Sequence, residues 1–380
     1  MPTKLDGWKE YELGQLLNYE QPSPYIVKST NYSDTYSTPV LTAGKSFIIG
    51  YTDEAVGIYN SLPVIIFDDF TTASQYVNFP FKVKSSAMKI LSPNVNLVLP
   101  KFIYYRMQII QFDHSTHKRY WIQQYSNIKV QIPSIPEQER IVSKIEELFS
   151  RLDASVAELQ TAKEKLKVYR QTVLYKAFQN LTDTITMDEV ADMIDPQPSH
   201  RTPPEVSNGV PYVGVGDIDY SARKINFAEA RKVSSSVLQE HQERYTIHKG
   251  DFIMGKIGTI GKPFMVPLPQ NYTLSANVIL IQPNYTKILP EFLYWQFSAP
   301  LVTQQLTVGA AATSQPAFGI KKARLLSIRI CDIEQQRQIT NEIEKSLSVC
   351  DSIEQTIDIS LHQAEALRQS ILKRAFEGEL

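Results

Sequence analysis

A glycine-rich stretch, "GKIGTIGK", comes nearest to known chemistry in this 380-residue chain. Glycines followed by a lysine are typical of loops that cradle phosphates, because a bare backbone can approach the anion closely. Here Gly255, Gly258 and Gly261 are spaced by three, and Lys262 precedes Pro263 rather than Ser or Thr. This spacing fits neither a dinucleotide fingerprint nor a nucleotide-hydrolysing loop. We therefore expect a loop whose backbone can approach a phosphate, without hydrolysis.

Other candidate motifs for catalysis or metal binding are weaker. The run "DPQP" at 195–198 differs from the Asx-Pro-Pro-aromatic motif of amino-methyltransferases and indicates an extended turn. His114 and His117 are spaced like metal ligands but lack further acidic or thiol partners, and the two cysteines, Cys331 and Cys350, support neither a disulfide framework nor a zinc site. No clustered acid-acid-lysine nuclease pattern is present. The sequence predicts a chain with no catalytic residues and no metal.

A long segment occurs twice, from Glu137 to Phe178 and, in altered form, from Glu334 to Phe376. Such internal repetition is typical of duplicated architectures. The alignment starts at an offset of 197, which places Glu137, Gln138 and Arg140 on Glu334, Gln335 and Arg337. After one inserted residue the offset is 198, and the identical pairs are Ile141/Ile339, Ile145/Ile343, Glu146/Glu344, Asp153/Asp351, Arg170/Arg368, Gln171/Gln369, Leu174/Leu372, Ala177/Ala375 and Phe178/Phe376.

Each copy has the heptad spacing of a coiled-coil helix. One row of the first copy is Ile145, Leu152, Leu159, Leu166 and Val173, and we place its second row four residues earlier, at Ile141, Leu148, Ser155, Ala162 and Tyr169. The rows of the second copy are Ile343, Cys350, Ile357, Ala364 and Ile371, and Ile339, Ser346, Ile353, Ser360 and Leu367. Neither Pro nor Gly interrupts either segment after its "EQ" motif, so we expect two long helices that pack on each other, antiparallel. Small and polar residues in these rows indicate either closely approaching backbones or a face shared with another protein, so we expect a partner.

The two helices divide the chain into four parts. These are residues 1–131, a first globular domain; 132–180, the first helix; 181–327, a second globular domain; and 328–380, the second helix. The domains end alike, in "PNVNLVLPKFIYYRM" and "PNYTKILPEFLYWQF", at an offset of 190. Short β-branched and aromatic runs bounded by turn residues predict strands. The fold class is therefore α+β: a pseudo-two-fold tandem repeat of two strand-rich domains joined by two long antiparallel coiled-coil helices.

Composition narrows the setting. The chain is 43% hydrophobic, with no long apolar run and no N-terminal signal pattern, so we expect a soluble cytoplasmic protein. The net charge is only -1, and no part has the broad basic stripe of a stand-alone DNA-binding protein. If the chain binds DNA, another subunit must supply much of the phosphate contact.

The helical segments carry a resemblance to a known family. "IPSIPEQERIVSKIEELFSRLDASVAELQTAKEKLKVYRQTVLYKAF" and the ending "LKRAFEGEL" resemble the DNA-specificity subunit of type I restriction-modification enzymes. "TPVLTAGKSFIIGY" and "LPVIIFDDFTTASQYVNFPFKV" also resemble a common first target-recognition domain of that family, and "GDFIMGKIGTIGK" a common second one. The resemblance covers nearly the whole chain, although recognition domains diverge widely.

The resemblance implies a non-catalytic subunit in phage defence. It would bind double-stranded DNA and recruit two modification subunits, which use S-adenosylmethionine to methylate adenine N6, and restriction subunits, which use ATP and Mg. Each recognition domain would read one half of a split, asymmetric target, and the helices would set the spacing. Two alternatives stay open: a two-headed scaffold that binds protein rather than DNA, and a specificity subunit of a related system that only methylates.

Candidate DNA contacts follow from side-chain chemistry, since Arg and Lys reach guanine or phosphate and Gln pairs with adenine. In the first domain we expect contacts from Thr71, Thr72, Ser74, Gln75, His117, Lys118, Arg119 and Tyr120. In the second domain we expect them from Lys256, Thr259, Lys262, Thr313, Ser314, Gln315, Lys321 and Lys322.

Candidate contacts to the modification subunits lie at the helix ends, where the two copies are most alike. They are Glu137, Gln138, Arg140, Arg170, Gln171 and Phe178, with their mates Glu334, Gln335, Arg337, Arg368, Gln369 and Phe376. An equally weighted interpretation is that these residues only pack the rod ends, with Phe178 and Phe376 capping the coiled coil.

Overall fold

A computed structural model describes residues 7–44, 46–112, 120–199, 201–310 and 317–380. The chain forms two compact units, Met1–Gln160 with Asp358–Leu380, and Thr161–Ile357. Each unit holds one globular domain together with half of each long helix. The division by packing therefore cuts both helices, whereas the predicted parts follow chain order.

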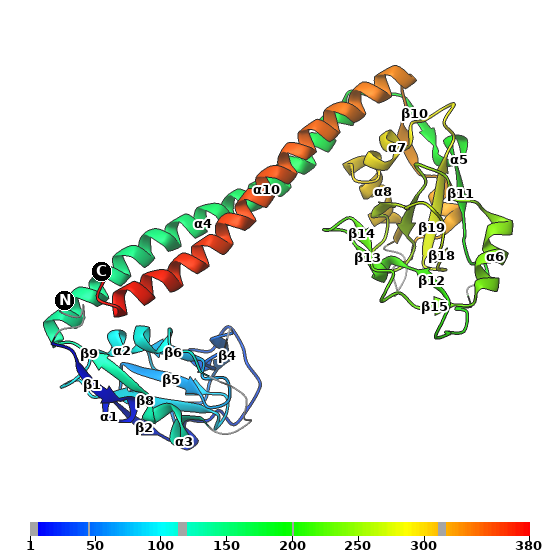
Figure 1. The fold of residues 1–380 in the computed structure, drawn as a ribbon. Helices are drawn as coiled ribbons and strands as arrows, with labels where there is room; N and C mark the ends of the chain where they lie inside the picture. Colours follow the sequence, from blue (N-terminus) through cyan, green and yellow to red (C-terminus); the bar gives the residue numbers. More distant parts are fainter. Residues whose placement is uncertain (1–6, 45, 113–119, 200, 311–316) are drawn as a thin grey trace. The chain divides into compact units, whose positions relative to one another are not determined.

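Unit 1 has two main sheets (Figure 1). The first has four antiparallel strands in the order β2 (Leu17–Glu20), β8 (Met88–Pro93), β5 (Val64–Asp68), β6 (Ser74–Val77). The second has the order β4 (Ile48–Thr52), β3 (Thr38–Leu41), β7 (Lys82–Val83), with β3 and β7 parallel. A separate pair joins β1 (Lys9–Glu12) to β9 (Lys129–Ile132). The helices are α1 (Leu13–Leu16), α2 (Pro100–Met107), α3 (Tyr120–Gln123), and the 3-10 turns η1 (Ser23–Tyr25) and η2 (Tyr125–Asn127).

Unit 2 repeats this plan. Its four-stranded sheet has the order β11 (Ala191–Ile194), β19 (Val278–Pro283), β16 (Phe252–Gly255), β17 (Pro263–Met265). Its three-stranded sheet has the order β15 (Lys232–Val233), β12 (Val210–Val213), β18 (Thr273–Leu274), and β10 (Thr184–Thr186) pairs with β20 (Ser327–Arg329). The additions are a hairpin, β13 (Ile218–Asp219) with β14 (Lys224–Ile225), and extra helices. The helices are η3 (Val215–Asp217), α5 (Met187–Val190), α6 (Ser235–Arg244), α7 (Pro290–Gln296), α8 (Pro300–Ala310) and α9 (Ile320–Arg324).

The central strand β5 shows why these domains are rich in continuous apolar runs. Successive strand residues face opposite sides of a sheet. Ile65 and Phe67 belong to one hydrophobic cluster, whereas Val64 and Ile66 belong to another. Both faces are covered, so the run "VIIF" has no exposed position. The predicted strand-rich α+β domains are confirmed.

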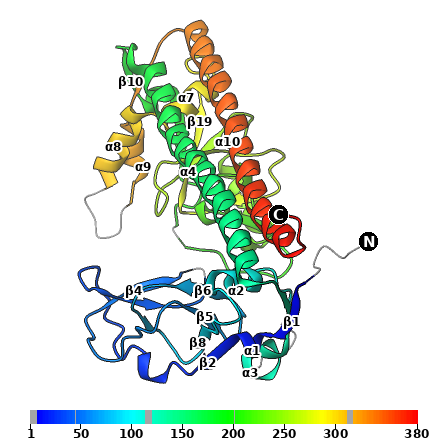
Figure 2. The same cartoon turned by 90° about the vertical axis from the view of Figure 1, so that its left-hand side faces the viewer.

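The long helices α4 (Ile135–Gln179) and α10 (Ile333–Phe376) are also confirmed, and they pack together (Figure 2). In unit 1 the first turns of α4, including Ile145 and Phe149, pack with the last turns of α10, including Ile371 and Phe376. In unit 2 the last turns of α4 pack with the first turns of α10. The pairing is therefore antiparallel, as the heptads predicted.

The second predicted heptad row is correct at half of its ten positions: Ile141 is buried, and Leu148, Ile339, Ser346 and Ser360 are half-buried, but the other five are exposed. Ala162 and Tyr169 are exposed, Tyr169 by 53%, as is Leu367 of α10. The buried and half-buried row instead follows the first row by four residues. Its members are Phe149, Val156, Lys163, Arg170 and Ala177 in α4, and Leu347, Glu354, Leu361, Arg368 and Ala375 in α10. Both choices satisfy a seven-residue spacing, and only packing decides which side of the first row faces the partner helix.

Candidate nucleic-acid interface

The loop between β5 and β6 in unit 1 is a tight polar turn. The Asp68 carboxylate accepts hydrogen bonds from the backbone N–H groups of Phe70 (2.8 Å) and Thr71 (3.2 Å). Thr72 has a φ of 57°, in the left-handed region that side chains other than glycine rarely adopt. The turn leaves Phe70 and Thr71 exposed at its tip. It can therefore present polar atoms to a ligand from a fixed backbone.

The loop between β16 and β17 in unit 2 is the glycine-rich stretch. Gly261 N donates to Gly255 O (3.0 Å), which closes the loop on itself. A Cβ at Gly255 would meet Thr259 O at 1.8 Å, and Gly258 has a φ of 78°, so glycine is required at both places. Thr259 and Lys262 are exposed on this loop.

These two loops occupy equivalent positions, each between the third and fourth strands of a four-stranded sheet. A second segment returns to the same place in each domain. Tyr120 N donates to Asp69 O (3.0 Å) in unit 1, and Phe318 N donates to Lys256 O (2.8 Å) in unit 2. In each domain the structure thus brings together the two sequence-distant regions from which the candidate contacts were drawn.

The predicted DNA-contact residues differ in how exposed their side chains are. Thr71, Thr259, Lys262, Lys321 and Lys322 are exposed, and Thr72 and Gln75 are half-buried. His117, Lys118, Arg119, Thr313, Ser314 and Gln315 lie outside the described residues.

Three candidates are not available as surface contacts. Ser74 is buried and accepts a hydrogen bond from Gln108 Nε2 (2.9 Å). Tyr120 is only 2% exposed and packs edge-on against Phe112. The Lys256 ammonium lies 3.0 Å from Asp195 Oδ2 and is largely buried. We therefore assign these three to holding the loops in place, because a polar turn residue next to a strand end can point inward as readily as outward.

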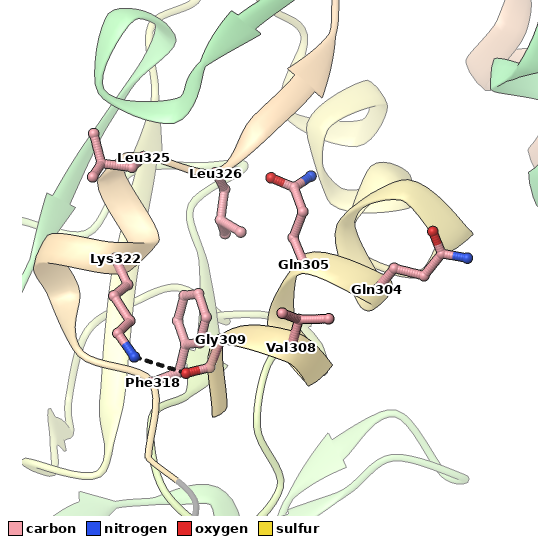
Figure 3. A pocket seen from close by; sticks show the side chains of 8 residues that line it. All are labelled: Gln304, Gln305, Val308, Gly309, Phe318, Lys322, Leu325 and Leu326. Atoms are coloured by element: carbon pink, nitrogen blue, oxygen red, sulfur yellow. Dashed lines mark hydrogen bonds between the residues drawn. The ribbon is translucent and has the colours of Figure 1, made fainter. Parts of the chain in front are cut away.

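Lys322 lies on α9 beside a largely apolar hollow of about 460 Å³ between α8 and α9 (Figure 3). Its ammonium donates to Gly309 O (2.8 Å). Val308 and Leu325, at the hollow, are strongly exposed. This apolar surface was not predicted from the sequence, because neither residue belongs to a periodic pattern.

A charge pair supports the candidate loop in each domain, and the loop residue is the anion in unit 1 and the cation in unit 2. In unit 1 Asp69, the residue after β5, lies 3.6 Å from Lys89 Nζ, and both side chains are 1% exposed. Lys89 also donates to Gln21 Oε1 (3.1 Å). In unit 2 the equivalent residue after β16 is Lys256, and its partner is Asp195. "DPQP" therefore supplies a charge partner to the loop, which its sequence did not reveal.

The helix ends carry a buried glutamine in each repeat. Gln138 is fully buried. Leu99 N donates to its Oε1 (2.8 Å), and its Nε2 donates to the carbonyls of Leu97 (3.0 Å) and Pro133 (2.9 Å). The side chain thus ties the start of α4 to the segment before α2, a structural role that burial makes the better assignment than a partner surface.

The matching glutamine in the second repeat is Gln336, not Gln335. Leu289 N donates to Gln336 Oε1 (2.8 Å), and Nε2 donates to the carbonyls of Lys287 (3.1 Å) and Cys331 (2.9 Å). Gln335 is exposed. The offset between the repeats is therefore 198 from the start of the helices, and the predicted insertion is wrong. From the sequence alone, Gln138 can be aligned with either of the adjacent residues Gln335 and Gln336.

Arg170 and Arg368 join the two helices reciprocally. Arg170 lies 2.7 Å from Asp351 and 2.9 Å from Glu354 in unit 2, and Arg368 pairs with Asp153 in unit 1. Burial opposes the charge on Arg170, but hydrogen bonds and charge from Asp351 and Glu354 outweigh it and raise its pKa. The same Arg–Asp pair occurs in both repeats with the helices exchanged.

Phe178 and Phe376 are buried at the helix ends. Phe178 packs against Phe292 of α7 with ring centroids 5.4 Å apart, and Phe376 packs against Phe102 of α2 at 5.2 Å. They attach each helix end to a globular domain rather than capping the coiled coil.

Several predicted partner contacts are accessible. Gln171 and Gln369 are exposed in both repeats, as are Arg140, Glu334 and Arg337, and Glu137 is half-buried. Exposed apolar residues accompany them, and some of these were predicted to lie in a helix seam. They are Val168, Tyr169, Tyr175, Val349 and Ile353 in unit 2, and Ile359 and Leu367 in unit 1.

Within the described residues, no helix is long and apolar enough to cross a membrane.

Comparisons with known proteins agree on one family. The model for the type I restriction modification DNA specificity domain matches residues 5–164 and 183–363, once in each half. The type I restriction enzyme EcoR124I/EcoR124II specificity subunit of Escherichia coli is 47% identical over 175 residues, which cover 43% of each chain. The EcoBI specificity subunit of Escherichia coli is 25% identical over 276 residues, 66% of this chain and 58% of that one. The alignments therefore span about half the length of these relatives.

Solved structures share the fold. A chain reported under "Structural basis underlying complex assembly and conformational transition of the type I R-M system" has a TM-score of 0.72, 16% identity and 99% coverage of both chains. The HsdS subunit from Thermoanaerobacter tengcongensis has a TM-score of 0.55 and 16% identity, covering 99% of this chain and 98% of that one. With the family model matched in both halves, this chain belongs to the type I restriction-modification DNA-specificity family.

Proposed function

We propose that this chain is the DNA-recognition subunit of a type I restriction-modification enzyme. The observation that carries the proposal is the repeated placement of two unlike loops at one position of one topology, between the third and fourth strands of each four-stranded sheet. Two similar domains on one chain are suited to reading two half-sites on one duplex. Because the loops differ in sequence, the target is split and asymmetric.

Within this proposal the candidate residues divide by chemistry. Lys262 and Thr259 are exposed on the glycine-rich loop and suit phosphate and base-edge contacts, whereas the half-buried Gln75 of β6 suits adenine. The small net charge leaves much of the phosphate contact to partner subunits, since binding strength to DNA depends on the number of phosphates neutralised. Helices α4 and α10 set the spacing between the half-sites.

The chain itself is non-catalytic in this proposal. Its partners are double-stranded DNA, two modification subunits that methylate adenine N6 with S-adenosylmethionine, and restriction subunits that use ATP and Mg. Two copies of one partner need features present in both repeats. Gln171 and Gln369 meet this requirement, because they are identical, equivalent and exposed.

Replacing both Gln171 and Gln369 by Arg should abolish copurification of the modification subunit while leaving the melting temperature unchanged. A control that replaces Gln179, exposed beyond the last heptad, should leave copurification intact.

Genome-wide methylation mapping tests the recognition function. Cells would carry this chain with its cognate modification subunit, with and without exchange of residues 181–327 for another recognition domain. A split, asymmetric motif of which one half changes on exchange is the expected result. No methylated motif, despite a stable complex and an active partner, would favour a scaffold that binds protein. Cleavage assays on unmodified DNA then separate a restricting enzyme from one that only methylates.

A further inference from the structure

The β13–β14 hairpin of unit 2, residues 218–225, has no counterpart among the described strands of unit 1. Its turn is well defined. Asp219 Oδ1 accepts hydrogen bonds from Ser221 N (2.9 Å) and Ala222 N (2.8 Å), and Arg223 follows with a φ of 52°. A residue other than glycine keeps this backbone conformation where its surroundings hold it there.

One side of the hairpin contacts the candidate recognition loop. The Lys262 ammonium lies 4.1 Å from the centroid of the Tyr220 ring, a short cation–π distance. The Tyr220 hydroxyl also lies 3.4 Å from Lys262 O, as a donor to it, and the ring meets Phe264 edge-on. A lysine side chain has many rotamers, so a ring under its ammonium removes much of that freedom before any ligand binds.

The turn of the same hairpin contacts the helix pair. Arg223 donates to Asp351 Oδ2 (2.9 Å) on α10. The other oxygen of that carboxylate lies 2.7 Å from Arg170 of α4. One carboxylate therefore joins the hairpin to both helices. The equivalent Asp153 in unit 1 pairs with Arg368, and the described part of that unit supplies no second cation to it.

The small energy expected of the Arg223–Asp351 ion pair indicates that the hairpin positions the loop rather than stabilising the fold. Arg223 is 67% exposed, and exposed ion pairs contribute little to folding. The hairpin nevertheless contacts the loop and the helices at once, so losing either contact frees the loop to move relative to the helix pair.

We propose that the β13–β14 hairpin holds Lys262 in a fixed position relative to helices α4 and α10, with Tyr220 as a positioning residue and Arg223 as its attachment to α10. This inference rests on the proposed function and deepens it. Reading of the second half-site is then coupled to the helices that set the spacing, whereas the described part of unit 1 offers no such hairpin for the first half-site.

Methylation mapping with variants tests the coupling, and it works even when the target sequence is unknown at the start. Tyr220→Ala and Arg223→Ala should raise methylation at genomic sites altered in the second half-site, or with a spacer one base pair longer or shorter. The expected rise is about fivefold relative to the full motif, the order of a lost surface interaction. Sites altered in the first half-site should keep the wild-type ratio.

Two variants separate positioning from folding. Tyr220→Phe keeps the ring under Lys262 and should resemble the wild type. Lys224→Ala removes a neighbouring exposed cation of the same hairpin and is the matched control. Melting temperatures should change little in all of them. If Tyr220→Ala fails to accumulate, Arg223→Ala still decides the matter, since it leaves the Tyr220 ring and Lys262 in place and should loosen the second half-site alone. Lys262→Gln removes the proposed DNA contact itself and gives the effect expected when that contact is lost.

The outcomes distinguish this inference from the proposed function. A split wild-type motif, with Arg223→Ala indistinguishable from Lys224→Ala, would overturn the hairpin proposal and leave DNA recognition standing. Equal loosening of both half-sites would also overturn it. No methylated motif for the wild-type complex would overturn both.

Discussion

The two recognition domains have the same strand order but hold their candidate loops differently. In unit 1 the residue after the third strand is Asp69, paired with Lys89 in a fully buried site. In unit 2 it is Lys256, paired with Asp195 at a partly exposed site, and the loop is further fixed by glycines. Each loop therefore has a charge pair beneath it, but the two partners come from different positions, β8 in unit 1 and the residue after β11 in unit 2. A buried charge needs a partner of opposite charge, and either sign of the loop residue meets this need.

The largest expected effect comes from removing the lysine of each charge pair, which tests whether the two pairs differ in burial. Lys89→Met leaves the Asp69 carboxylate buried without its cation and should lower the free energy of unfolding by about 4 kcal/mol. Lys256→Met should cost about 2 kcal/mol or less, because Asp195 retains some exposure to water. Hydrogen exchange of the two four-stranded sheets measures each unit separately. Asp69→Asn combined with Lys89→Met should recover part of the loss, because the neutral amide still accepts the hydrogen bond from Trp121 N (2.8 Å). Equal effects of the two lysine variants would contradict the comparison.

The attachment of the helix ends is the same in both units and should respond equally. Phe178→Ala and Phe376→Ala each remove a buried ring and should cost about 3 kcal/mol. Exchange should increase in α7 for the first variant and in α2 for the second. Tyr175→Ala, one turn away and exposed, is the control and should cost less than about 0.5 kcal/mol.

A smaller effect tests the corrected alignment of the repeats. Gln138→Leu and Gln336→Leu each remove the hydrogen bonds to one backbone N–H and two carbonyls, most of them part-buried, and should cost about 2 kcal/mol. Gln335→Leu should cost less than about 0.5 kcal/mol, because its side chain is exposed. Denaturant titration compares the three variants. A large effect at Gln335 with none at Gln336 would restore the offset of 197.

The smallest expected effect is a difference in pH dependence. His241 in unit 2 is buried, and its ring contacts Thr273 and Gln197. Burial lowers the pKa of His241. Below an unfolded pKa of about 6.5 the unfolded chain binds a proton that the folded chain resists, so stability of unit 2 should decrease as pH falls through this value. His241→Gln should flatten this dependence when melting is followed from about pH 7 to about pH 5, whereas the exposed control His362→Gln should not.

The repeat, the helices and the strand-rich domains were predictable because each depends on local spacing. Tyr169 and Gln335 show where spacing stops being informative. A row four residues before or after a heptad position is equally periodic, and adjacent glutamines align equally well at two offsets. Gln138 and Gln336 differ from their exposed neighbours because their side chains bind backbone groups that lie 39 and 47 residues away in sequence.

The candidate site was predicted in part for the same reason. Thr71, Thr259 and Lys262 were recognised from turn chemistry, and they are exposed on equivalent loops. Ser74, Tyr120 and Lys256 were drawn from the same stretches but point into the domain. In a turn, the same residue types occur at positions that face inward and at positions that face outward. The direction of each side chain therefore depends on the residues that pack beneath the turn.

By itself the sequence determined the tandem repeat, the two antiparallel helices and the family, since these follow from periodicity and motifs along the chain. Only the tertiary structure decided which helix row packs inward, which glutamine joins helix to domain, and which charges support each loop. Those choices depend on contacts between residues far apart in sequence, such as Lys256 with Asp195 and Arg223 with Asp351. Local spacing carries no information about such pairs, because burial and charge pairing arise only when the chain has folded.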